Sequence, residues 1–146
     1  MVSAAQIEGG VATLERCFCP IALNNPHDFG NFTLHYWATQ HIPNTVAYLF
    51  DFGDYKLGYS ADTAFDLELI AWLDQCDLVL HDVTWPPWWD AEEMQKLHPS
   101  LARLLELPDS FQQKTFLCHY DDTTYREQEI GRYRYLEQNR LYQLVG

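Results

Sequence analysis

The stretch that decides the fold runs from residue 45 to residue 81 and reads TVAYLFDFGDYKLGYSADTAFDLELIAWLDQCDLVLH. Its first part, up to Ser60, is rich in β-branched and aromatic residues and is interrupted by Gly53-Asp54. Runs of this kind on either side of a Gly-Asp pair are typical of two strands joined by a tight hairpin. We therefore expect strands over Thr45–Phe52 and Tyr55–Ser60.

After Asp62 the hydrophobic spacing changes to that of a helix. The apolar residues that share one helical face are Phe65, Leu69, Trp72 and Leu73. Thr63 followed three residues later by Asp66 resembles a capping box, which places the helix start near Thr63. Asp77–His81 then predicts a short buried strand. Strands that alternate with a helix indicate a layered α/β fold.

The segments outside this stretch extend the same pattern. We expect a strand at Phe32–Thr39, a helix at Ala91–Leu107 that Pro99 breaks near His98, a strand at Thr115–Cys118, a helix at Tyr125–Leu136 and a closing strand at Leu141–Val145. Residues 1–31 contain several Gly and Pro residues and are predicted to be an irregular lead-in, with a short strand around Ala12–Phe18. The chain, residues 1–146, is expected to form a single domain.

The composition excludes several classes of protein. Hydrophobic residues make up 47% of the chain, which indicates a globular protein and not a disordered one. Acidic residues or Gln interrupt every apolar run before it reaches the length of a membrane span, and the first six residues do not resemble a signal peptide. We expect a cytoplasmic protein with no membrane partner. The net charge of −12 disfavours extended nucleic acid, because it repels phosphate backbones.

Candidate metal ligands stand at or just beyond the expected strand ends, where layered α/β folds build their sites. They are His41, Asp62, His81, Asp82 and His119. A single polar residue at such a place is usually an ordinary loop residue. Four strand ends that each carry His or Asp in one small domain favour a site. Imidazole and carboxylate together form a ligand set for zinc, manganese or iron.

Four segments resemble, in order and spacing, the later motifs of metallo-β-lactamase-fold hydrolases. They read HIPNTVAY at 41–48, LGYSADT at 57–63, DLVLHDVT at 77–84 and FLCH at 116–119. The likeness is greatest to the branch of tRNA 3′-processing endonucleases and phosphodiesterases, and it covers residues 32–146 as the carboxyl-terminal half of such a fold. It implies half of an αβ/βα sandwich, with a mixed sheet and flanking helices.

The resemblance also implies a site for two divalent ions, with zinc expected and manganese or iron as alternatives. It makes His41 a ligand of the first ion, His119 a ligand of the second and Asp62 the carboxylate that bridges them. The His-x-His-x-Asp-His motif, which supplies most ligands in that superfamily, is absent from this sequence. Each ion is left with two protein ligands, whereas catalytic zinc sites use about three. We therefore expect the chain alone to bind metal weakly or not at all.

Three further positions gain an expected role from the same resemblance. His81 matches a histidine that lies beside the scissile phosphate and donates a proton, with Asp82 as the expected partner in acid–base catalysis. Asp82 stands where that branch usually has Glu, and Ala61 where it usually has Gly. His98 resembles part of an element near the active site of some relatives, which makes it a candidate for substrate contact.

The sequence Trp85-Pro-Pro-Trp88-Trp89 directly follows the His81 strand and is expected to form an irregular loop. Trp85 and Trp88 are candidates to contact a substrate by stacking, or to anchor a protein partner. The competing interpretation is a loop that folds its indoles back onto the core.

Two hypotheses about function follow from these observations. The first is a metal-dependent hydrolase of phosphodiester or related ester bonds in a small anionic substrate, inactive as this chain alone because its site is incomplete. It predicts a partner, either a second copy in a homodimer or the missing amino-terminal half. The second is a non-catalytic binding domain that retains the scaffold and uses the Trp85–Trp89 loop.

Overall fold

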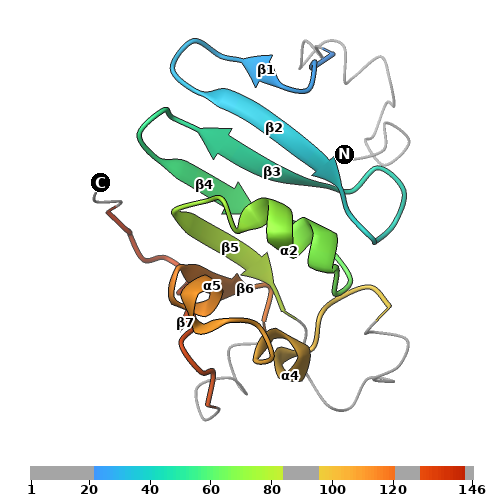
Figure 1. Ribbon diagram of the computed structural model, residues 1–146, viewed down its shortest axis with the longest axis vertical. Helices are drawn as coiled ribbons and strands as arrows, with labels where there is room; N and C mark the ends of the chain where they lie inside the picture. Colours follow the sequence, from blue (N-terminus) through green and yellow to red (C-terminus); the bar gives the residue numbers. More distant parts are fainter. Residues whose placement is uncertain (1–21, 84–95, 121–128, 144–146) are drawn as a thin grey trace.

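Seven strands form one mixed sheet, and they lie side by side in the order in which they follow one another along the chain (Figure 1). They are β1 His27–Asp28, β2 Thr33–Ala38, β3 Val46–Asp51, β4 Lys56–Tyr59, β5 Leu78–Asp82, β6 Thr115–Cys118 and β7 Arg134–Tyr135. Neighbouring strands from β1 to β4 are antiparallel, and those from β4 to β7 are parallel. The computed structural model describes residues 22–83, 96–120 and 129–143.

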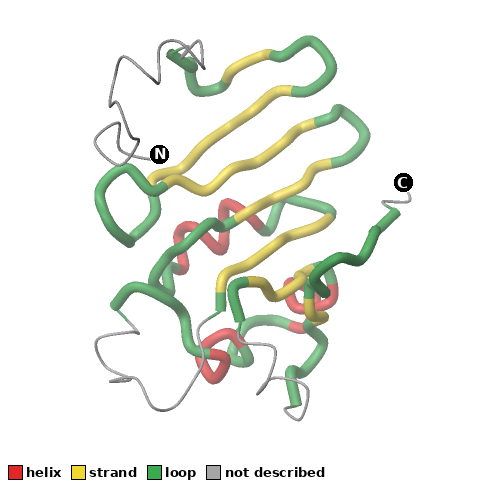
Figure 2. The backbone as a smooth tube through the Cα atoms, turned by 180° about the vertical axis from the view of Figure 1, so that it is seen from behind, coloured by secondary structure: helices red, strands yellow, loops and turns green. Residues whose placement is uncertain are grey.

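The helices of the described residues lie on one side of this sheet, as the two opposite views show (Figures 1 and 2). They are α2 Leu67–Leu73, α4 Leu101–Leu104 and α5 Asp109–Gln113. The core lies between these helices and the sheet and includes Leu49, Leu69, Leu73, Val79, Leu104, Phe111 and Leu117. Because successive side chains of a strand point to opposite faces, alternate strand residues supply this core.

The opposite face of the sheet is aromatic and apolar, and no helix of the described residues covers it (Figure 2). Its side chains form rows across paired strands: Tyr36–Tyr48–Tyr59–Leu80–Phe116 and Phe50–Leu57–Leu78. A cavity of about 690 Å³ on this face is lined by Leu57, Leu80 and Phe116 together with Leu136, Tyr142 and Gln143. The structure confirms the mixed sheet with flanking helices that the sequence predicts for half of a sandwich, and it places the described helices on one side.

Helix α2 begins later than the sequence pattern suggests. Asp66 is its N-cap, since the Asp66 carboxylate accepts hydrogen bonds from the backbone N–H groups of Glu68 (2.9 Å) and Leu69 (3.3 Å). The expected start near Thr63 is therefore wrong. The Thr63 hydroxyl donates to the Ala64 carbonyl instead, and Thr63 is fully buried. The four residues between Asp62 and α2 form a connection that belongs to the candidate site described below.

The remaining expectations met mixed outcomes. The strands expected around 32–39, 45–52, 55–60, 77–81 and 115–118 are confirmed with small shifts at their ends. Within the stretch Ala91–Leu107, the expected break near His98 is confirmed, and the helix resumes as α4 at Leu101–Leu104. Residues 96 and 97, expected to be helical, form a turn instead. Residues 1–21, including the strand expected at Ala12–Phe18, lie outside the described part, and β1 forms within the segment expected to be irregular.

The carboxyl-terminal segment differs more from the predicted structure. Residues 129–136 of the helix expected over Tyr125–Leu136 are not helical, and they contain β7, which pairs with β6. The physical reason is the alternation of this segment. Tyr133 is buried and donates a hydrogen bond to the Leu104 carbonyl (2.7 Å), whereas Arg134 is exposed, and a period of two is that of a strand. Residues 141–143 form no strand, so the described part of the expected closing strand is also wrong.

No helix in the described part of the chain has the length and apolar character needed to cross a lipid bilayer.

Candidate metal centre

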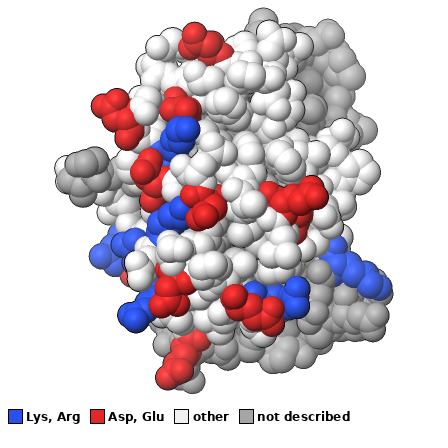
Figure 3. All heavy atoms as spheres, viewed as in Figure 1, with Lys and Arg blue, Asp and Glu red and all other residues white. Residues whose placement is uncertain are grey.

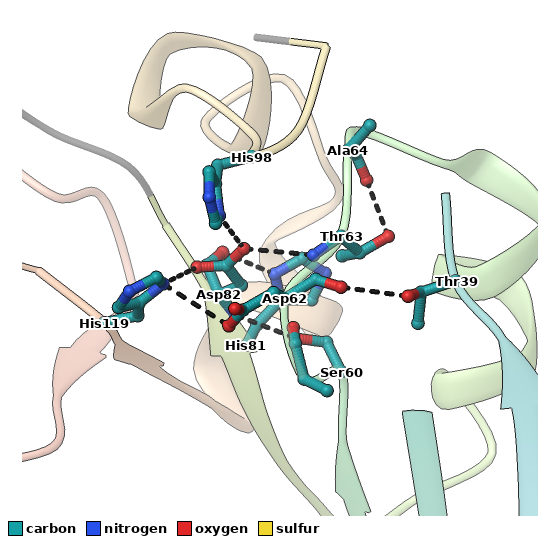
Figure 4. A network of polar contacts seen from close by, with 10 residues as sticks. Thr39, Ser60, Asp62, Thr63, Ala64, His81, Asp82, His98 and His119 are labelled. Atoms are coloured by element: carbon teal, nitrogen blue, oxygen red, sulfur yellow. Dashed lines mark hydrogen bonds and ion pairs between the residues drawn. The ribbon is translucent and has the colours of Figure 1, made fainter. Parts of the chain in front are cut away.

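Four side chains meet at one edge of the sheet (Figure 4). Asp62, Asp82, His98 and His119 each offer a ligand atom, and these atoms lie within 4.8 Å of one another. Asp62 follows β4, Asp82 ends β5, His119 follows β6, and His98 lies just before α4. Two carboxylates and two imidazoles are a donor set suited to a divalent cation such as zinc.

The parallel arrangement of β4, β5 and β6 explains why residues so far apart in the sequence converge. The carboxyl ends of parallel neighbours meet at the same edge of a sheet, which is where α/β folds place ligand sites. Pairing continues beyond the strands: the Ser60 amide donates to the Leu80 carbonyl (2.9 Å), and the Val83 amide donates to the Cys118 carbonyl (3.1 Å). The residues that follow each strand are therefore held in register.

The backbone turns sharply at two of these strand ends. Ala61 has a φ of 50° and His119 a φ of 65°, both in the left-handed region that favours glycine. Ala61 occupies the position where the related hydrolases usually have Gly, so the structure gives a backbone reason for that preference. Strained residues of this kind cluster at functional sites, where the surrounding structure holds them in place.

Asp82 is the centre of the polar network. Its side chain is 1% exposed, and His98 Nδ1 lies 2.7 Å from Oδ2 while His119 Nδ1 lies 3.0 Å from Oδ1. Oδ2 also accepts a hydrogen bond from the Thr63 amide (3.1 Å), and the Asp82 amide donates to Ser60 Oγ (2.8 Å). A carboxylate can only accept hydrogen bonds, so both imidazoles donate to it from Nδ1–H. In the neutral form of each ring, Nε2 is then the unprotonated nitrogen.

Burial divides the four side chains into two pairs. Asp82 and His98 are 1% and 9% exposed, whereas Asp62 and His119 are 44% and 55% exposed. His119 Nδ1 lies 3.5 Å from Asp62 Oδ1 as well as 3.0 Å from Asp82 Oδ1. One imidazole nitrogen thus faces two carboxylates. The centre has a rigid buried side and a side open to solvent.

His41 stands beside this group but outside it. The loop that carries it is tied to the β4 end, because Thr39 Oγ1 donates to the Asp62 carbonyl (2.9 Å) and the Ala64 amide donates to the Gln40 carbonyl (2.8 Å). The His41 ring lies 5.0 Å from the His98 ring, and the His98 ring lies 5.1 Å from that of His119. The Nδ1 atom of His41 is buried and has no hydrogen-bond partner among the described residues. A buried nitrogen on a ring that lies 5.0 Å from the His98 ring fits a place in a larger metal site.

His81 is not among the four converging side chains. Its ring is 1% exposed, packs edge-on against Phe111 of α5 and donates from Nδ1 to the Asp82 carbonyl (2.7 Å). The Nε2 atom is buried, and no group in the described part of the chain forms a hydrogen bond with it. Burial lowers the pKa of His81 below its ordinary value, so the ring is neutral at neutral pH. The catalytic role expected of His81 stays a prediction. Trp85 and Trp88 lie outside the described residues.

Sequence reasoning did not assign roles to several residues that shape the centre. Ser60 and Thr63 hold Asp82 through hydrogen bonds. Both belong to the LGYSADT segment, and their place next to the expected ligand Asp62 was the sequence feature that could have identified them. Burial raises the pKa values of Tyr59 and Cys118, and both lie close enough to Asp62 and Asp82 for the negative charge of the carboxylates to raise them further. Burial, helped by Asp82 and Asp62, raises the pKa of the Cys118 thiol to about 12, so it is protonated at neutral pH.

Comparison with known proteins finds the same family by a family model and by curated relatives. A family model described as "Anti-Pycsar protein Apyc1" matches residues 2–142. Two curated proteins carry that name. The one from Paenibacillus harenae is 40% identical over 109 residues, which are 73% of this chain and 42% of that protein. The one from Bacillus phage BSP38 is 32% identical over 117 residues, 77% of this chain and 43% of that protein. The chain thus spans less than half the length of these relatives.

Solved structures agree on the fold. The metallo-β-lactamase-fold protein YhfI from Bacillus subtilis matches with a TM-score of 0.55 at 15% identity, over 75% of this chain and 48% of that one. A long form of RNase Z from yeast matches with a TM-score of 0.50 at 16% identity, over 75% of this chain and 15% of that one. These likenesses confirm the metallo-β-lactamase fold that the four motifs predict, and at such identities they show the fold alone.

Proposed function

The chain belongs to the Anti-Pycsar protein Apyc1 family, and from its candidate metal centre we propose that it forms part of a metal-dependent hydrolase of small phosphodiesters. The observation that carries the proposal is the convergence of Asp62, Asp82, His98 and His119 within 4.8 Å at the ends of three parallel strands. Family membership and the metallo-β-lactamase fold support it. The complete two-ion site draws further ligands from outside these residues, because the chain lacks His-x-His-x-Asp-His.

The residues present fit divalent ions. Asp62 and His119 would hold them on the solvent-open side, and His41 would add its buried Nδ1, which has no hydrogen-bond partner within residues 22–83, 96–120 and 129–143. When bound, the ions supply Lewis-acid chemistry: they lower the pKa of water and stabilise negative charge that develops on a phosphoryl oxygen. Asp62 offers a ligand atom within 4.8 Å of those of Asp82, His98 and His119, and its carboxylate would be shared between the two ions.

Proton transfer is assigned to the pair of Asp82 and His98. The 2.7 Å contact between His98 Nδ1 and Asp82 Oδ2 fixes the orientation and the tautomer of the imidazole. His98 Nε2 is then the atom that exchanges a proton with the leaving oxygen of the substrate. His81 is less suited to this task, because its ring packs against Phe111 and its Nε2 atom is itself buried, out of reach of a substrate.

The substrate is proposed to be compact, with one phosphodiester group. The net charge of −12 opposes a polynucleotide, whose many phosphates would all be repelled. On the face shown in Figure 3, acidic and basic side chains are interspersed, and the described residues there form no broad basic patch. A small diester needs only the local positive charge of bound ions.

The test combines this chain with the amino-terminal segment of the Paenibacillus harenae relative, in the presence of zinc or manganese. Bis(p-nitrophenyl) phosphate and a 3′,5′-cyclic nucleotide serve as substrates. We expect no turnover by the chain alone and measurable turnover by the mixture. His98→Gln should lower kcat by about 10²- to 10⁴-fold with little change in KM. His35→Gln, a change in β2 outside the centre, is the matched control and should have no effect.

A mixture that binds metal but cleaves neither substrate would overturn the proposal. That result would favour the competing hypothesis of a non-catalytic binding domain. Equal losses of kcat in the His98 and His35 variants would show that His98 acts only through the stability of the fold.

A further inference from the structure

We infer that this chain by itself holds one divalent cation between Asp62, Asp82, His98 and His119, with Asp82 and His98 as ligands in place of the absent motif. The inference rests on the proposed function for the location of the site, but not for its activity. The resemblance to metallo-β-lactamase-fold hydrolases makes only Asp62 and His119 metal ligands among these four. Asp82 and His98 are added as ligands because the structure places their ligand atoms within 4.8 Å of those of Asp62 and His119.

The number and kind of donor atoms suit one ion. Two carboxylates and two imidazoles, with ligand atoms within 4.8 Å of one another, equal the four ligands of a tetrahedral zinc site. The count of two ligands per ion, on which weak binding was expected, leaves out Asp82 and His98. With all four residues, the chain meets the coordination number of zinc without help from outside.

The buried half of the site is already held in position. Asp82 is fixed by the Thr63 amide and by Ser60 Oγ, and burial confines His98 beside it, since only 9% of the His98 side chain is exposed. Two ligands that need no ordering reduce the entropy lost when the ion binds. The other two, Asp62 and His119, are 44% and 55% exposed, so an ion can reach the centre from solvent.

Charge favours the same conclusion. Asp62 and Asp82 both face His119 Nδ1, at 3.5 and 3.0 Å, and a single N–H cannot satisfy two carboxylates equally. Within the described part of the chain, the ion pairs found for these two carboxylates are with histidines. A divalent cation would neutralise both carboxylates in a chain whose net charge is −12.

The one-ion form has a consequence for activity. An ion seated between Asp82 and His98 replaces the 2.7 Å contact that orients His98. The pair then cannot also position His98 for proton transfer. The chain alone is therefore expected to bind metal without turnover, so metal binding and turnover can be measured separately.

The experiment is a zinc titration of the purified chain by isothermal titration calorimetry, with cobalt(II) absorption as a report of coordination geometry. We expect one ion per chain and the visible spectrum of four-coordinate cobalt. Asp82→Asn and His98→Gln should each weaken zinc binding by about 10- to 100-fold or more. His35→Gln should bind zinc like the unchanged chain. Circular dichroism of each variant verifies that it is folded.

Two results would overturn the inference. One is the absence of zinc binding by the folded chain. The other is unchanged affinity in both Asp82→Asn and His98→Gln while Asp62→Asn loses binding, because the ion would then be held without the buried pair. If Asp82→Asn fails to fold, His98→Gln decides alone. Intact zinc affinity with no turnover after the amino-terminal segment is added would refute the proposed function and leave this inference standing.

Discussion

Replacement of Gly58 by alanine is expected to destabilise the fold by about 1–2 kcal/mol, because α2 packs directly on the backbone of β4 at this residue. A Cβ atom added at Gly58 would lie 2.8 Å from Leu73 Cδ2 and 3.0 Å from Cys76 Sγ. Both neighbours are buried in the core, so neither can move into solvent. Gly58 also lies four residues before Asp62, and a displaced β4 would move the candidate metal centre.

The magnitude follows from these distances. Carbon atoms in favourable contact are about 3.5–4.0 Å apart, so Leu73 Cδ2 must retreat by roughly 0.7 Å or more. Forcing extra atoms into a packed core costs about 1–3 kcal/mol. The lower entropy of unfolded alanine relative to glycine returns about 0.4–1 kcal/mol. The difference lies between about 0 and 2.6 kcal/mol, and the 2.8 Å approach to buried atoms places Gly58→Ala in the range of about 1–2 kcal/mol. Each kcal/mol lowers Tm by about 2–4 °C in a chain of this size.

The assay is urea-induced unfolding followed by circular dichroism and tryptophan fluorescence. Cys76→Ala supplies a matched background, since it removes the Sγ atom that the new methyl group meets at 3.0 Å. Gly58→Ala should therefore cost less in Cys76→Ala than in the unchanged chain, with a coupling free energy of about 0.5–1 kcal/mol. Equal or greater stability of Gly58→Ala would refute the close packing of α2 on β4, and additive effects in the double variant would refute the contact with Cys76.

Two further predictions concern the strand ends. Ala61→Gly should raise the free energy of unfolding by roughly 0.5–1 kcal/mol, because Ala61 has a φ of 50° that glycine adopts without strain, and a loss of stability in urea unfolding would contradict this. Burial lowers the pKa of His81 in the folded state, so the unfolded chain binds more protons as the pH falls below 6.5, and stability decreases by up to about 1.4 kcal/mol per pH unit. His81→Gln should lose this part of the acid sensitivity, and equal slopes for both proteins between pH 6.5 and 5 would count against it.

The sheet could be predicted from the sequence where local pattern alone decides the structure. β3 and β4 were expected within two residues of their ends, because aromatic and β-branched residues flank Gly53-Asp54. The start of α2 was misplaced because Thr63 and Asp66 are both good capping residues. Only the tertiary structure shows that the Thr63 amide is already bound to Asp82.

The convergence of Asp62 and His119 was predictable because both follow strands that run parallel, and such ends share an edge. The contact between Asp82 and His98 was not, since 16 residues separate them and no local rule brings them together. That Asp82 faces the centre whereas His81 packs against Phe111 could have been predicted in part from strand geometry. Neighbours in a strand point to opposite faces, so only one of the two could face the centre.

The motifs identified the superfamily but not the family. Segments such as LGYSADT and FLCH place metal ligands, and that chemistry is shared across many metallo-β-lactamase-fold proteins. The likeness to tRNA 3′-processing endonucleases and phosphodiesterases therefore recovered the fold. The family to which the chain belongs is shown instead by agreement over nearly the whole chain, residues 2–142.

The most direct test of a metal centre at the ends of β4, β5 and β6 is anomalous diffraction from crystals of this chain grown with zinc, recorded above and below the zinc absorption edge. We predict one anomalous peak enclosed by Asp62, Asp82, His98 and His119. Zinc found only at other histidines, such as His27 or His35, with these four side chains free of metal, would contradict it.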